Sequence, residues 1–282
     1  MYRCRGAFNL LSLLKMLRGS SAASARPIRD EAGEAKPDPS ASQRNVILVL
    51  LLMLAAAAWA VLIWAPVSMD VPMASSAIGP HAALFLATWV VMMVAMMLPA
   101  TAPMFLAFHK EQNVKYEPSD AFAFTWIFVT AYLLVWASAG LATYAGELIA
   151  NAAHSRLGPA IAAQLGGAVI MLAGVYQLTP LKEFCLRECR TPIAMTTWHG
   201  EADTFRKGLL HGFFCVGCYW PLFVTLYPLG MSAGAMTVIT LIVLAEKALP
   251  WPTPVRYATA IALVVYGVIV AVGSGAVTPR MG

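Results

Sequence analysis

The chain has 282 residues, of which 60% are hydrophobic and only 12% charged, with a formal net charge of +5 and a mean hydropathy of +0.70. A soluble domain carries about 25% charged residues, so this composition excludes an ordinary soluble globular protein. It predicts an all-α, polytopic bundle of membrane helices. The lipid bilayer is therefore the first expected partner, and no nucleic acid is expected.

The first 44 residues differ from the rest because they hold many of the charges. Leucines 10, 13, 14 and 17 recur at helical spacing beside Lys15 and Arg18, which is typical of a short amphipathic helix on a membrane surface. A spurious early start of the chain is the alternative, and Lys15 argues against a cleaved signal peptide. The stretch 20–42 reads as a disordered linker, so we predict a cytoplasmic tail over residues 1–44.

Seven later segments are long and apolar enough to cross a bilayer core, which needs about 20 residues. They are Asn45–Pro66, His81–Phe108, Ala121–Ile149, Pro159–Thr179, Gly208–Leu229, Gly230–Ala248 and Val255–Gly273. The turn between the fifth and sixth is very tight, so a re-entrant pair is the alternative there. Together they predict one transmembrane metal-binding domain over residues 45–276.

The distribution of Lys and Arg predicts the orientation of these seven segments. With the N-terminus inside, seventeen of the nineteen basic residues fall on the inner side, and only Arg156 and Arg280 fall outside. The positive-inside rule therefore predicts an N-in, C-out protein. We expect it in the inner (cytoplasmic) membrane of a bacterium.

A methionine-rich stretch, MMVAMMLPATAPM, lies in the second segment. Met93, Met97 and Met104 share one helical face, and thioether sulfur is a ligand for Cu(I) but not for zinc, calcium or magnesium. Methionine is also a routine filler of apolar helices. We predict Met93 and Met97 as weaker, exchangeable copper ligands, with packing as the alternative.

Two cysteine pairs follow, both predicted near the inner face of the membrane. Cys185 and Cys189 are one helical turn apart in CLREC, where neighbouring Lys and Arg residues favour thiolates. In HGFFCVGC, Cys215 and Cys218 lie about 40° and 20° to either side of His211, so the three side chains share one helical face. Stable disulfides are unusual on the reducing side, which favours metal binding or redox cycling.

Thiolates prefer Cu(I), Zn(II) or an iron–sulfur cluster, so all four cysteines are predicted metal ligands. His211 is a candidate further ligand, although it could instead cap a helix or bond a carbonyl group. Glu246 and Lys247, at the inner end of the sixth segment, are expected to form a structural ion pair with each other.

The same stretches carry a family resemblance. MMVAMMLPATAPM, QLTPLKEFCLRECRTP, GLLHGFFCVGCYW and LAEK resemble a bacterial family of predicted metal-binding integral membrane proteins, a domain of unknown function. The resemblance runs from about Trp59 to Val272 and implies a multi-helix membrane protein that binds metal, some members being proposed copper chaperones. The chain has Tyr219-Trp220 where the family has a tryptophan after its CxxC, so no role is assigned to either aromatic residue.

These observations together favour a Cu(I) chaperone or handling protein rather than an enzyme. A copper donor or acceptor protein is the expected partner. The sequence has no glycine-rich phosphate-binding loop, so it does not resemble an ATP-driven pump. Two alternatives stay open. One is a membrane thiol–disulfide oxidoreductase that uses CVGC with a quinone or thiol partner. The other is a scaffold in which the four cysteines form a tetrahedral zinc site.

Overall fold

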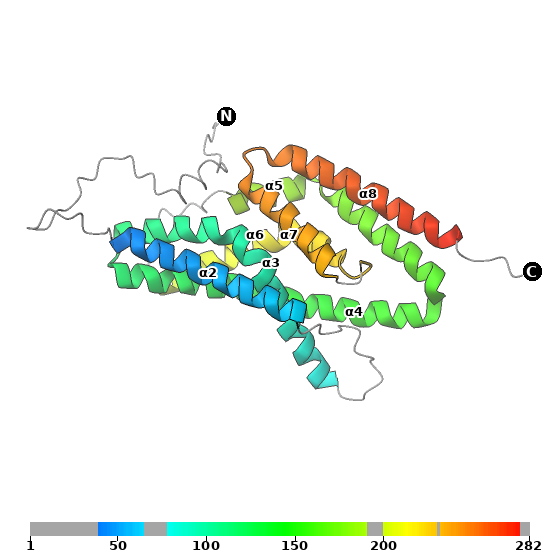
Figure 1. The fold of residues 1–282 in the computed structure, drawn as a ribbon, viewed down its shortest axis with the longest axis horizontal. Helices are drawn as coiled ribbons and strands as arrows, with labels where there is room; N and C mark the ends of the chain where they lie inside the picture. Colours follow the sequence, from blue (N-terminus) through cyan, green and yellow to red (C-terminus); the bar gives the residue numbers. More distant parts are fainter. Residues whose placement is uncertain (1–38, 65–77, 191–199, 230–231, 277–282) are drawn as a thin grey trace, which may run out of the picture.

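The structure is a computed structural model that describes residues 39–64, 78–190, 200–229 and 232–276, and it contains only helices within these ranges. Figure 1 labels them in chain order. They are α2 (Pro39–Trp64), α3 (Ile78–Lys115), α4 (Pro118–Tyr176), α5 (Pro180–Arg190), α6 (Glu201–Val224), α7 (Ala233–Ala248) and α8 (Pro252–Ala276). The all-α prediction is confirmed for the described residues. The predicted amphipathic segment near the N-terminus lies outside them.

The third and fourth predicted segments belong to one long helix, α4, instead of two helices joined by a loop. The residues between Ile149 and Pro159 are helical, which agrees with the high helix propensity of the alanines in this stretch. In Figure 1 the first part of α4 runs along the lower side of the bundle, above the projecting start of α3, and its last part returns beside α8. The helix ends at Tyr176, and α5 then leaves at an angle of 63°.

Within the described residues, four helical stretches are long and apolar enough to cross a membrane: Ser42–Trp64, Ala82–Lys115, Pro118–Leu148 and Pro252–Gly273. A fifth is added if the end of α4 and the bent α5 count as one broken span. The 16 residues of α7 extend only about 24 Å at 1.5 Å per residue, less than a hydrocarbon core of about 30 Å. Seven spans and the N-in orientation are therefore not confirmed.

The outer surface of these helices is unusually apolar. Only 22% of the apolar stretch is buried in both α2 and α8, and large side chains such as Leu52, Trp64 and Val272 point outward. A soluble monomer rarely exposes so much contiguous apolar surface. The described helices are thus consistent with a membrane protein.

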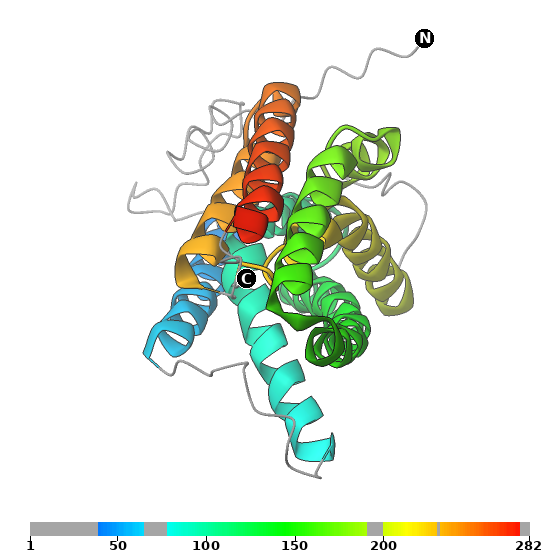
Figure 2. The ribbon, with the colours of Figure 1, turned by 90° about the vertical axis from the view of Figure 1, so that its right-hand side faces the viewer.

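The core lies where α3, α4 and α6 pack together, with α5 against α6 and α7 against α3. Glycines on α6 allow its close approach to α4. A methyl group on Gly208 would lie 2.6 Å from the Phe128 carbonyl oxygen, and one on Gly212 would lie 2.8 Å from Val135 Cβ. Figure 2, turned by 90°, shows α8 beside the returning part of α4. The close α4–α6 contact fixes the position of the cysteines on α6.

Candidate metal centre

Helix α5 presents the first cysteine pair on its buried face. Pro180 begins this 11-residue helix, which suits a residue whose missing N–H would have no helical partner. Cys185 and Cys189 are four residues apart and both are buried, together with Lys182 and Leu186. The bend after α4 directs this face toward α6.

Helix α6 presents the second pair, and the predicted common face is confirmed. The side chains of His211, Cys215 and Cys218 are all fully buried, at the expected positions i, i+4 and i+7. This face packs against α4 on one side and α5 on the other.

The two pairs meet within a single chain. Cys218 Sγ lies 3.6 Å from Cys189 Sγ, although 29 residues separate them. Cys185 also interacts with Cys218, and Cys189 with Cys215. A methyl group on Gly217 would lie 2.9 Å from Cys185 Sγ, so the glycine of CVGC leaves room for that sulfur.

The sulfurs approach one another in pairs and do not surround a common centre. The described part of the chain contains no group of three or more His, Cys, Asp or Glu side chains that could hold a metal ion. A tetrahedral zinc site needs four converging ligands, so the structure gives the zinc scaffold no support. The four cysteines are free thiols and carry no disulfide.

Buried charges surround the thiols, and their pairing differs from the expectation. Glu246 pairs with Lys182 at 2.8 Å, both side chains being fully buried, and not with its neighbour Lys247. Lys247 instead donates to Cys215 Sγ at 3.2 Å and to Thr101 Oγ1 at 2.9 Å. Successive residues near a helix end point in different directions, which explains why the two neighbours take different partners.

His211 is enclosed by aromatic rings. Its ring centroid lies 5.8 Å from that of Phe128 and 5.6 Å from that of Tyr132, and neither ring nitrogen has a hydrogen-bond partner. It therefore neither caps a helix nor bonds a carbonyl group. A buried, unpartnered imidazole is compatible with a ligand role, which stays a prediction.

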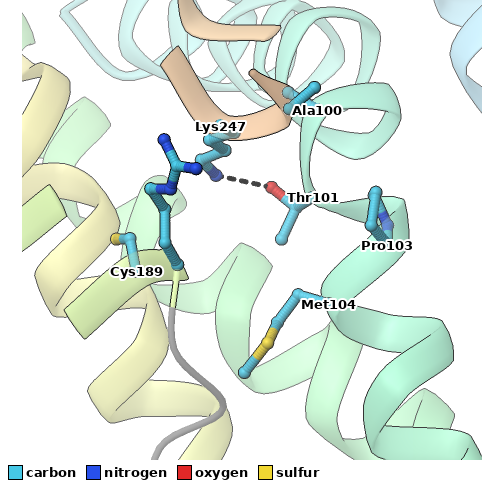
Figure 3. Close-up of a pocket in the computed structure, with 8 residues that line it drawn as sticks. Ala100, Thr101, Pro103, Met104, Cys189 and Lys247 are labelled. Atoms are coloured by element: carbon cyan, nitrogen blue, oxygen red, sulfur yellow. Dashed lines mark hydrogen bonds between the residues drawn. The ribbon is translucent and has the colours of Figure 1, made fainter. Parts of the chain in front are cut away.

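A small cavity of about 30 Å³ opens beside the thiols. Its wall includes Cys189, Thr101 and Lys247, and also Met104 from α3, as Figure 3 shows. A water molecule needs about 10–15 Å³, so the cavity has room for one small guest. It brings a thioether and a thiol to the same space.

The methionines chosen from sequence occupy a different environment. Met93 and Met97 are fully buried in the apolar core and do not line this cavity. Met104 shares their helical face but was not among the ligands predicted from the sequence. Met104 follows Pro99 and Pro103, two residues that lack a backbone N–H and so interrupt the hydrogen bonding of α3. Pro103 lines the same cavity as Met104, so the two prolines are the sequence feature that marks this part of α3.

Comparison with known proteins places the chain in a family. The model of the PpoB2 family, described as "copper chaperone", matches residues 86–270, which include the four cysteines and the methionine-rich stretch. No curated protein and no solved structure matches the chain. The match agrees with the copper handling that the resemblance implied, while the label of that resemblance stays a prediction. The chain belongs to the PpoB2 copper chaperone family.

Proposed function

We propose that this protein is a Cu(I) chaperone embedded in the inner membrane of a bacterium, and that it holds the ion between the thiolates of Cys189 and Cys218. The observation that carries the proposal is the 3.6 Å approach of these two sulfurs from different helices. The seven-segment, N-in arrangement is part of the proposal. It places both cysteine pairs on the reducing side, where thiols persist.

Two sulfurs are enough for Cu(I). This closed-shell, soft ion accepts two thiolates as a complete ligand set, whereas a structural zinc site requires four ligands. A metal–sulfur bond is about 2.3 Å long, so two sulfurs closer than about 4.6 Å can both bind one ion. A separation of 3.6 Å lies within this limit, and the linear arrangement that two-coordinate Cu(I) prefers would need the sulfurs to move apart by about 1 Å. The absence of a larger ligand group in the described residues is therefore compatible with copper.

The neighbouring sulfurs provide a route for exchange. Cys185 interacts with Cys218 and Cys215 with Cys189, so each main ligand has a second thiol beside it. Met104 lines the same small cavity as Cys189 and offers a weaker, neutral ligand, which the Cys189 side chain would meet by turning toward the cavity. Weak ligands next to strong ones allow an ion to be handed on, which a chaperone must do for a copper donor or acceptor protein. His211 would be a further ligand, while a ligand role for Met93 and Met97, which do not line the cavity, stays a prediction from the sequence.

The proposal is tested by anaerobic Cu(I) titration of the detergent-solubilised full chain against a chromophoric Cu(I) chelator. Wild type is compared with Cys189→Ser/Cys218→Ser. Removing both ligands should weaken Cu(I) binding by at least about 100-fold, more than the loss of a residue that only supports a ligand. Cys4→Ser is the matched control, because it removes a cysteine outside the two pairs and should leave binding unchanged.

Other results would overturn the proposal. Equal Cu(I) affinity in wild type and the double variant would exclude these thiols as the site. Absence of metal binding together with a reversible disulfide that includes Cys189 or Cys218 would favour the oxidoreductase. Retention of zinc in preference to copper would favour the scaffold.

A further inference from the structure

Lys247 is a buried ammonium group in contact with the sulfur cluster. Its side chain comes from the end of α7 and donates to Cys215 Sγ on α6 and Thr101 Oγ1 on α3. Its ammonium group also lies 5.6 Å from the ring centroid of Tyr219, the residue after Cys218. The ammonium group of Lys247, which comes from α7, is therefore enclosed by side chains of α3 and α6 beside the proposed copper site.

The other buried charges do not neutralise Lys247. Glu246, its neighbour, is paired with Lys182. Arg190, the other cation on the cavity wall, is only partly buried and donates to the backbone carbonyl oxygens of Glu246 and Leu249, so Lys247 is the buried cation in direct contact with a thiol. In the described part of the chain, no ion pair joins Lys247 to a carboxylate. An isolated buried charge is costly, so the sulfur cluster is the part of the site that must supply the negative charge.

Counting charges shows which ion fits. Two thiolates carry −2, and a singly charged ion between them leaves −1, equal and opposite to Lys247. A doubly charged ion between the same thiolates gives a neutral unit and leaves the ammonium without an anion. A third thiolate would restore the balance, but the described residues contain no converging group of three such ligands.

From this arrangement we infer that Lys247 is the specificity-determining residue that makes the site select singly charged soft ions over doubly charged ones. The inference rests on the proposed function and deepens it, because it extends the expected cargo from Cu(I) to Ag(I) and disfavours divalent thiophilic ions. Lys247 acts through the thiolates by its charge and is not itself a ligand.

The test compares Ag(I) with Cd(II), two redox-inert, closed-shell ions that both prefer sulfur. Wild-type protein should bind Ag(I) more tightly than Cd(II), and the binding should depend on Cys189 and Cys218. Lys247→Met, which has a similar length and no charge, should lower the ratio of Ag(I) to Cd(II) affinity by at least about tenfold. Opposite charges a few ångströms apart in a buried site interact by more than one tenfold step in an equilibrium constant.

Two further variants separate charge from shape. Lys247→Arg keeps the charge and should keep the preference for Ag(I). Thr101→Val removes a hydrogen-bond partner of Lys247 but no charge, and it should also leave the ratio unchanged.

Each alternative outcome counts against a different statement. A wild-type preference for Cd(II) overturns the inference even if Lys247→Met fails to fold. An unchanged ratio in a folded Lys247→Met also overturns it, while cysteine-dependent Cu(I) binding would leave the proposed function standing. No cysteine-dependent binding of Ag(I) or Cu(I) in wild type overturns both.

Discussion

Two sulfur-rich regions of this protein differ in their surroundings. The cysteines of α5 and α6 lie among Lys182, Lys247 and Glu246, all buried or nearly so. Met93 and Met97 of α3 are as deeply buried, but they pack in the apolar core. Apolar packing alone accounts for a buried methionine, because thioethers fill irregular gaps.

The difference shows why deep burial is a poor guide to function here. Buried charges are costly and persist only where partners offset the cost, so their presence beside thiols indicates a site more strongly than sulfur does. Met104 is intermediate, because it belongs to the methionine stretch and also lines the cavity beside Cys189. Four experiments test this contrast.

The largest effect is expected from breaking the buried ion pair. Lys182→Met leaves Glu246 charged and without its partner, which should lower the free energy of unfolding by about 3–5 kcal/mol. Unfolding in detergent measures the loss. The double variant Lys182→Met/Glu246→Leu removes both charges and should recover most of the stability. A double variant no more stable than the single one would show that the charges are not coupled.

A smaller loss is expected at Gly217. The added methyl group of Gly217→Ala would lie 2.9 Å from Cys185 Sγ, and overpacking of this kind costs about 1–3 kcal/mol. Thermal unfolding measures the cost, and alkylation of Cys185 reports its displacement. Gly146→Ala is the control, because nothing lies within 4 Å of its added methyl group. Equal behaviour of the two variants would show that Cys185 does not require the space.

The exchange route predicts a kinetic effect at Met104. Met104→Leu removes the thioether from the cavity wall and should slow Cu(I) transfer to a chelator by about tenfold, equivalent to about 1.4 kcal/mol of barrier. Its equilibrium affinity for Cu(I) should change little, because the thiolates hold the ion. Stopped-flow transfer with the full chain measures the rate, and an unchanged rate would remove Met104 from the route.

The smallest effect is expected in the apolar core. Met93→Leu/Met97→Leu conserves side-chain volume, so stability should change by less than about 1.5 kcal/mol per site. These residues do not line the cavity, so transfer should slow by no more than about twofold, equivalent to about 0.4 kcal/mol of barrier. A slowing equal to that of Met104→Leu would place all three sulfurs on one route and erase the contrast between the two regions.

Much of the fold could be predicted from local patterns. Apolar runs identified most helices, and the 3.6-residue period placed His211, Cys215 and Cys218 on one face, which is buried as expected. Local patterns did not decide how far each helix continues. The 59-residue α4 contains two predicted segments, and the predicted sixth span forms only the 16-residue α7.

The sequence by itself determined which residues can bind a soft ion, because that property belongs to thiols and thioethers wherever they lie. The tertiary structure alone decided which of them meet. Cys189 and Cys218 come together across 29 residues, Lys182 finds Glu246 across 64, and Lys247 finds Cys215 across 32. Helical periodicity orients a side chain within its own helix, whereas the packing of α5, α6 and α7 sets which faces touch, and no local pattern records that packing.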